Sequence, residues 1–151
     1  MRKRMTQALI ILIALFAAAQ FVRPERANPP VDPGRTLRGQ VGSAPAVTVI
    51  ERACSDCHSN ATVWPSYTQV APVSWLMVYA VRKGREVVNF SDWASYPPGV
   101  QQTLLEVSCQ DVSTNKMPGV YAMLHPEMRL SSQDIDTICG LARGAQAGNT
   151  K

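Results

Sequence analysis

The sequence predicts an all-α fold, a small domain of roughly four or five helices. In several segments apolar residues recur three and four positions apart, which is the spacing of one face of a helix. No convincing run of alternating or β-branched residues predicts a strand. With 151 residues the chain is long enough for one domain with one core and too short for two ordinary domains.

The N-terminal segment has the layout of an export signal rather than of a core helix. Arg2, Lys3 and Arg4 precede an almost unbroken apolar run over residues 8–22. We therefore expect residues 1–22 to act as a signal peptide or as a membrane anchor.

Two fates of this segment stay open. The three alanines at residues 17–19 offer a cleavage site, and a helix over residues 8–22 would span only about 22 Å of a hydrocarbon core of about 30 Å. Against cleavage, residues 23–45 are rich in proline and glycine and are typical of a linker or tether. An anchored domain on a semi-extended stalk is the preferred interpretation.

The net charge of +4 comes mostly from this N-terminal segment. Without Arg2, Lys3 and Arg4 the chain has 12 basic and 11 acidic side chains, a charge of +1. The composition therefore gives no support for nucleic-acid binding and no strong preference for an acidic or a basic partner.

The folded domain is expected over residues 46–146, and its helices follow from apolar spacing. Val47, Val49 and Ile50 lead into a first short helix. After Pro72 the residues up to position 81 are apolar nearly all round, which predicts a central buried helix.

Two further helices are expected in the second half of the chain. The spacing of Val100, Leu104, Val107 and Val112 predicts an amphipathic helix. Ser131 and Asp134 stand at capping distance before a last helix that is expected to close near Gly144. Its apolar positions repeat at i, i+3, i+4 and i+7 and are Ile135, Ile138, Cys139 and Ala142. Between these regions, Ser91 and Asp92 could cap a short turn.

The first helix carries the most informative motif. Cys54, Ser55, Asp56, Cys57 and His58 spell CSDCH, the pattern through which c-type haem is attached. Two thiols three positions apart can add to the two vinyl groups of one porphyrin, and the histidine that follows then lies under the iron as the proximal ligand. We expect one covalent haem c on the two cysteines, with the histidine bound to its iron.

A CxxC pair can also form half of a zinc site or the active dithiol of a thioredoxin-like protein. Both alternatives fit less well. A structural zinc site usually supplies a second close pair, whereas Cys109 and Cys139 stand thirty residues apart with His125 alone between them. A thioredoxin-type dithiol belongs to a βαβ pattern, which the sequence lacks.

The sixth position of the iron decides between electron transfer and small-molecule chemistry. Met117 lies in a polar loop, immediately before Pro118 and shortly ahead of the last helix. This placement resembles the Met-Pro loop of small class I c-type cytochromes, so Met117 is the expected distal ligand. His125 is the second choice because a neutral imidazole also binds iron, and an open site is the third.

The other two cysteines flank this loop on separate expected helices. In an oxidising compartment Cys109 and Cys139 are expected to form a disulfide that holds the loop at both ends. The alternative is that both remain free as small buried apolar side chains.

The segment CSDCHSNATVWPSYTQVAPVSWLMVYAVRKGREVVNFSDW resembles the haem-binding domain family of bacterial exported proteins, whose members carry CxxCH followed by similar WP, APVSW and NFSDW sequences. The later KMPGVYAMLHPEMRLSSQDI and the early QFVRPERANPPVDP extend the likeness over most of the chain. The resemblance implies a membrane-proximal exported domain with covalent haem on Cys54 and Cys57, His58 as proximal ligand and Met117 as distal ligand. It implies no particular reaction.

Together these observations predict a small cytochrome c-like helical domain around one haem, on the periplasmic side of the bacterial inner membrane. We expect it to be an electron carrier rather than an enzyme, with redox proteins of the periplasm or membrane as partners and attachment through residues 8–22. The alternatives are a soluble periplasmic protein after signal cleavage, a haem-based gas or redox sensor, and a peroxidase-like enzyme with an open iron. For that enzyme His125 is the obvious distal acid or base.

Overall fold

The computed structural model describes residues 1–123 and 125–149. In these residues the regular elements are six α-helices and five 3₁₀ helices, with no strand, so the expected all-α class is confirmed. The α-helices are α1 (Arg2–Ala19), α2 (Leu37–Val41), α3 (Pro45–His58), α4 (Val73–Val87), α5 (Pro98–Ser113) and α6 (Ser132–Asn149). The 3₁₀ helices are η1 (Pro33–Arg35), η2 (Ser66–Gln69), η3 (Phe90–Ser95), η4 (Gly119–Met123) and η5 (Pro126–Met128).

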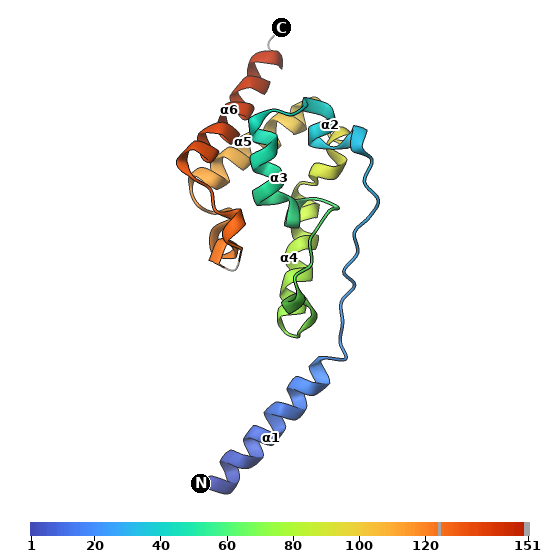
Figure 1. The fold of residues 1–151 in the computed structure, drawn as a ribbon, viewed down its shortest axis with the longest axis vertical. Coiled ribbons are helices and arrows are strands. Elements are labelled where there is room, and N and C mark those ends of the chain that lie inside the picture. The colour runs from blue at the N-terminus through green and yellow to red at the C-terminus, as the bar shows by residue number, and fades with distance from the viewer. Residues whose placement is uncertain (124, 150–151) are drawn as a thin grey trace.

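Helix α3 occupies the middle of the domain. It packs against α6 on one side and against α4 on the other, while α5 packs against α6. Helix α1 stands apart from the domain, and an extended chain runs from it alongside α4 to α2 (Figure 1). The motif at the end of α3 therefore lies between α4 and the η4–η5 segment.

The core is built from short apolar stripes on several helices. Its buried members are Leu37, Val47, Ile50, Val88, Phe90, Trp93, Leu105, Val112, Ile138 and Ala142. Helix α3 contributes Val47 and Ile50, which stand three positions apart on one face. The helix begins with Pro45, and proline is favoured at the first position of a helix. Leu37 is only 2% exposed, so the core begins within residues 23–45, earlier than the expected domain start.

Helix α4 forms as expected, but its expected place as the central buried helix is wrong. One face packs, through Ser74, Met77, Val81 and Gly84. Leu76 on another face remains 58% exposed. An all-round apolar helix can be buried in a core, but here α3 and η2 pack against α4 and leave its other faces uncovered.

The last helix begins with the expected capping box. The Ser131 hydroxyl accepts from the Asp134 amide at 3.1 Å, and the Asp134 carboxylate accepts from the Ser131 amide at 2.9 Å. Helix α6 then continues to Asn149, beyond the expected end near Gly144. An isolated glycine is tolerated inside a helix.

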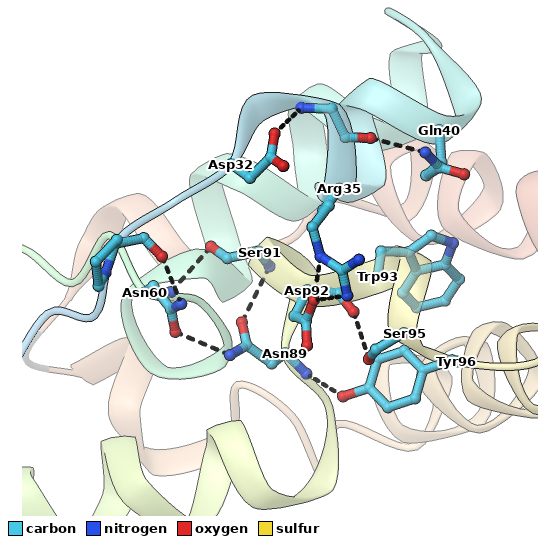
Figure 2. Close-up of polar contacts among 12 residues, drawn as sticks. Asp32, Arg35, Gln40, Asn60, Asn89, Ser91, Asp92, Trp93, Ser95 and Tyr96 are labelled. Carbon is cyan, nitrogen blue, oxygen red and sulfur yellow. Dashed lines mark hydrogen bonds and ion pairs between the residues drawn. The ribbon is translucent and has the colours of Figure 1, made fainter.

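The turn at residues 90–95 is capped by a different residue from those expected. Asn89 is the N-cap of η3, because its side-chain oxygen accepts from the Ser91 amide at 3.0 Å. The Ser91 hydroxyl instead accepts from the Asn60 amide, and Asp92 pairs with Arg35 at 2.6 Å (Figure 2). These contacts connect the loop after the motif, η1 and η3.

The chain that follows α1 is bound to the domain. We call residues 20–30 the strap. The Gln20 side chain donates to the Ala71 carbonyl at 3.3 Å and accepts from the Ala71 amide at 3.0 Å. The Trp75 indole donates to the Val22 carbonyl at 2.7 Å. The strap is therefore more ordered than the free tether that its proline and glycine content predicts.

The N-terminal helix differs from the expected apolar run at both ends. It includes the basic residues at positions 2–4 and stops at Ala19. Among residues 1–123 and 125–149, no helix is long and apolar enough to cross a membrane, so the transmembrane helix expected from residues 8–22 is not confirmed.

Candidate functional site

The three motif side chains share one face at the end of α3. Cys54, Cys57 and His58 occupy positions i, i+3 and i+4, which lie next to one another on a helix. Both thiols are free and partly exposed. The expected grouping of two thiols and one imidazole is therefore present in the structure.

The imidazole of His58 is oriented by backbone. Its Nδ1 lies 3.3 Å from the Val88 carbonyl oxygen, which can only accept, so Nδ1 carries the proton and Nε2 presents its lone pair. Burial lowers the pKa of His58, against smaller raising effects from the Val88 and Gly84 backbone and from Asp111. A neutral imidazole with one nitrogen fixed is the form that binds iron.

Burial also keeps the two thiols protonated. It raises the pKa of Cys54 to about 12, helped by the neighbouring Cys57. It raises the pKa of Cys57 to about 11, with Asp56 adding to the effect. The thiols are therefore poor nucleophiles in the folded chain without a bound group.

Helices α3 and α4 meet closely beside the motif. A Cβ atom at Gly84 would lie 2.4 Å from the Cys57 carbonyl oxygen and 3.0 Å from its carbonyl carbon. Only glycine allows this approach, because both neighbouring atoms belong to the backbone. Gly84 thus fixes how α4 sits against the cysteine that carries the motif's second thiol.

Arg85 holds the loop that follows the motif. Its guanidinium donates to the Ser59 carbonyl at 2.6 Å and to the Thr62 hydroxyl at 2.9 Å. It also donates to the Ala27 carbonyl at 2.8 Å and the Asn28 side chain at 2.9 Å. One side chain therefore joins α4, the motif loop and the strap. This role of Arg85 is not predictable from the sequence, since nothing there pairs it with residues so far along the chain.

The Met117 loop begins at the end of α5. The Lys116 and Met117 amides both donate to the Asp111 carbonyl, at 2.9 and 3.1 Å. The carboxylate of Asp111 pairs with the Lys116 ammonium at 3.0 Å, and its charge also acts on the His58 imidazole. Asp111 is thus tied to the start of the loop, while the Met117 side chain is 38% exposed.

The expected disulfide is confirmed. Cys109 and Cys139 are bonded, with their Cα atoms 4.8 Å apart, and join α5 to α6 on either side of the Met117 loop. These sulfurs are therefore not available as a second pair for zinc. The absence of strands in the described residues also removes the βαβ frame of a thioredoxin-like dithiol.

His125 is buried in a polar network of its own. Its Nε2 contacts the Tyr67 hydroxyl, and its Nδ1 lies 2.9 Å from a Glu127 carboxylate oxygen. Ligand-type atoms of Asp56, His125 and Glu127 all lie within 4.8 Å of one another. To bind haem iron, His125 would have to give up one of its two contacts, so it is less suited than a methionine on an open loop.

A cavity of about 10 Å³ lies between this network and the motif. Its lining includes Cys57, Trp64, Met77, His125 and Met128, and the Trp64 indole nitrogen is buried without a partner. The cavity has room for about one water molecule and not for a porphyrin.

One comparison with known proteins identifies a relationship. A family model described as a haem-binding domain matches residues 14–143. The match takes in α3 with its motif, the Met117 loop and most of α6. No curated protein and no solved structure matches the chain significantly.

Proposed function

The chain belongs to the haem-binding domain family, and from this premise we propose that it attaches one haem c through Cys54 and Cys57 and carries single electrons. The observation that carries this proposal is the geometry at the end of α3. Two thiols and an imidazole lie on one helical face, and the contact of the His58 Nδ1 with the Val88 carbonyl makes Nε2 the unprotonated nitrogen. Haem supplies a one-electron iron centre when it is held by such a set.

Exposed apolar side chains lie on the two segments that adjoin the end of α3. Leu76 and Val87 on α4 are largely exposed, as are Val120 and Met123 in η4. Helix α3 contacts both α4 and η5, and Figure 1 shows α4 and the η4–η5 segment on opposite sides of its C-terminal end. A bound haem would bury apolar area that these segments otherwise leave to water.

We assign the distal position to Met117. Its loop is tied to Asp111, close enough for that carboxylate to act on His58, and its thioether is accessible. A thioether opposite an imidazole raises the reduction potential relative to two imidazoles, and a six-coordinate iron leaves no open position for oxygen. This ligand pair suits a class I cytochrome-like carrier.

We place the domain on the periplasmic side of a bacterial inner membrane. Support comes from the N-terminal helix, in which basic residues precede an apolar run, and from the disulfide. Redox proteins of the periplasm or membrane are the corresponding partners.

One observation favours a second candidate, a sensor or peroxidase-like protein with an open iron. His125 is 5% exposed and is oriented by Glu127, which is the arrangement of a positioned acid or base. Carbon monoxide binding separates the two, because prompt and complete binding to the reduced protein requires a free or weakly held distal position.

Covalent attachment is tested by expressing the full chain with a cytochrome c maturation system and denaturing it. Haem should stay with the wild-type polypeptide through denaturing electrophoresis and acidic acetone extraction. It should be lost from a Cys54→Ser, Cys57→Ser double variant that still forms the Cys109–Cys139 disulfide. Complete extraction of haem from the wild-type chain would refute covalent attachment.

A further inference from the structure

A second hollow lies between the strap and α4. Its volume is about 460 Å³, within the range of pockets that bind small molecules. We call it the strap groove. The strap side consists of Val22, Arg23 and Pro24, and the α4 side consists of Trp75, Val78, Tyr79 and Arg82.

A hydrogen bond joins the two walls of the strap groove. The Trp75 indole donates to the Val22 carbonyl at 2.7 Å. Two residues before Val22 in the chain, the Gln20 side chain donates to the Ala71 carbonyl and accepts from the Ala71 amide. These contacts tie the strap to α4 and to the residues before it, across 51 and 53 positions of the sequence.

The lining combines apolar surface with two cations. Five of its seven side chains are apolar or aromatic. The Arg82 guanidinium lies 5.9 Å from the Tyr79 ring centroid, and its Nε is 3.9 Å from a Glu86 oxygen, while its side chain is 67% exposed. The Arg23 Nε donates to the Gln20 carbonyl at 3.1 Å. Each guanidinium has five N–H donors, so both retain donors for an anion.

The position of the groove matches an interface between water and lipid. It adjoins the end of α1, whose apolar side chains are exposed along the helix. Tryptophan and tyrosine are enriched at the headgroup level of a bilayer, and arginine also acts as an anchor there. An acidic amphiphile with a phosphate and alkyl chains matches a lining of two guanidiniums and five apolar or aromatic side chains.

We propose that the strap groove binds an anionic phospholipid. Its phosphate lies between Arg23 and Arg82, and the first carbons of its acyl chains lie against Trp75, Val78 and Tyr79. Binding fastens the strap to α4 and sets the height of the haem domain above the membrane. The placement at a membrane rests on the proposed function, whereas the lipid selectivity can be tested by itself.

The test uses the full haem-loaded chain in neutral detergent micelles, with ¹⁵N-labelled tryptophan. The haem iron is kept in its reduced state. Short-chain phosphatidylglycerol is added, and the three indole signals are followed by NMR. We expect the Trp75 signal to shift in a saturable way, because its N–H donates to the strap. Short-chain phosphatidylcholine and inorganic phosphate should leave the signal in place.

The Arg23→Gln, Arg82→Gln double variant should weaken the response to phosphatidylglycerol at least tenfold. A matched control, Arg26→Gln with Arg143→Gln, removes two exposed charges outside the groove and should respond like the wild type. The Trp64 and Trp93 indole signals report whether each variant remains folded.

An equal shift with phosphatidylcholine, a shift with inorganic phosphate alone, or an unchanged response in the Arg23, Arg82 variant would overturn the proposal. If these results occur while the chain keeps its covalent haem, the groove proposal fails and the proposed function stands. Loss of haem in the wild-type chain would instead refute the proposed function.

Discussion

Replacing Gly84 by alanine tests the packing that positions the motif. The new Cβ would lie 2.4 Å from the Cys57 carbonyl oxygen, whereas ordinary contact begins at 3.4 Å. Helices α3 and α4 would have to separate by about 1 Å, and overpacking of this kind costs about 1–3 kcal/mol. Alanine returns up to about 1 kcal/mol through helix propensity.

We therefore expect Gly84→Ala to lower the free energy of unfolding by about 1–2 kcal/mol, which is a fall in Tm of about 2–8 °C for a chain of this length. Urea unfolding followed by circular dichroism measures the change. The His58 contact with the Val88 carbonyl should loosen as α4 moves, so haem incorporation should also fall.

The matched control is Gly144→Ala in α6, where a Cβ meets nothing within 4 Å. This variant should gain about 0.4–1 kcal/mol, because alanine restricts the unfolded chain. If Gly84→Ala is as stable as the wild type, or gains as much as the control, then the close approach of α4 to Cys57 is not real.

Three further outcomes are expected. Replacing Cys109 and Cys139 by serine opens a loop with a sequence separation of 30 and should cost about 3–4 kcal/mol in urea unfolding; an unchanged midpoint would contradict the disulfide. In the haem-free chain at pH 8, burial should slow alkylation of Cys57 roughly a hundredfold relative to the urea-unfolded chain, since its pKa is raised to about 11 and that of Cys54 to about 12. The rate should rise as pH approaches that value, and equal rates in folded and unfolded chains would show that the thiols are not buried. Arg85→Gln removes four contacts between α4, the motif loop and the strap, so trypsin should cleave the strap much faster than in the wild type; an unchanged cleavage rate would mean that other contacts hold the strap.

Local sequence signals predicted the motif and most helices. The capping box at Ser131 and the apolar repeat after it depend on neighbours within a few residues, so the start of α6 could be found without tertiary information. The same holds for the helix that ends at His58. The disulfide was predicted from compartment and chain order rather than from geometry.

The burial of α4 could not be predicted in the same way. Its apolar residues cover the whole helix circumference, and periodicity does not show which face meets a neighbour. Gly84 was the available signal, because an isolated glycine weakens a helix and is compatible with close packing on that face, which the structure shows here. The strap and Leu37 lay in a segment whose composition resembles a free linker, and their contacts join residues far apart in sequence.

The candidate site also has a part that local spacing predicts and a part that depends on the tertiary fold. Cys54, Cys57 and His58 are brought together by one helical turn, which spacing alone determines. Met117 depends on how the loop after α5 folds back, and here Asp111 links the loop to the surroundings of His58. Its role as distal ligand stays a prediction.

The most direct test of the account is the visible spectrum of the exported, haem-loaded protein in oxidised and reduced forms, beside a Met117→Ala variant. We expect a low-spin spectrum with the weak long-wavelength band of a thioether bound to ferric iron, and loss of that band in the variant. A high-spin spectrum that the substitution leaves unchanged would contradict ligation by His58 and Met117, and with it the electron-carrier function.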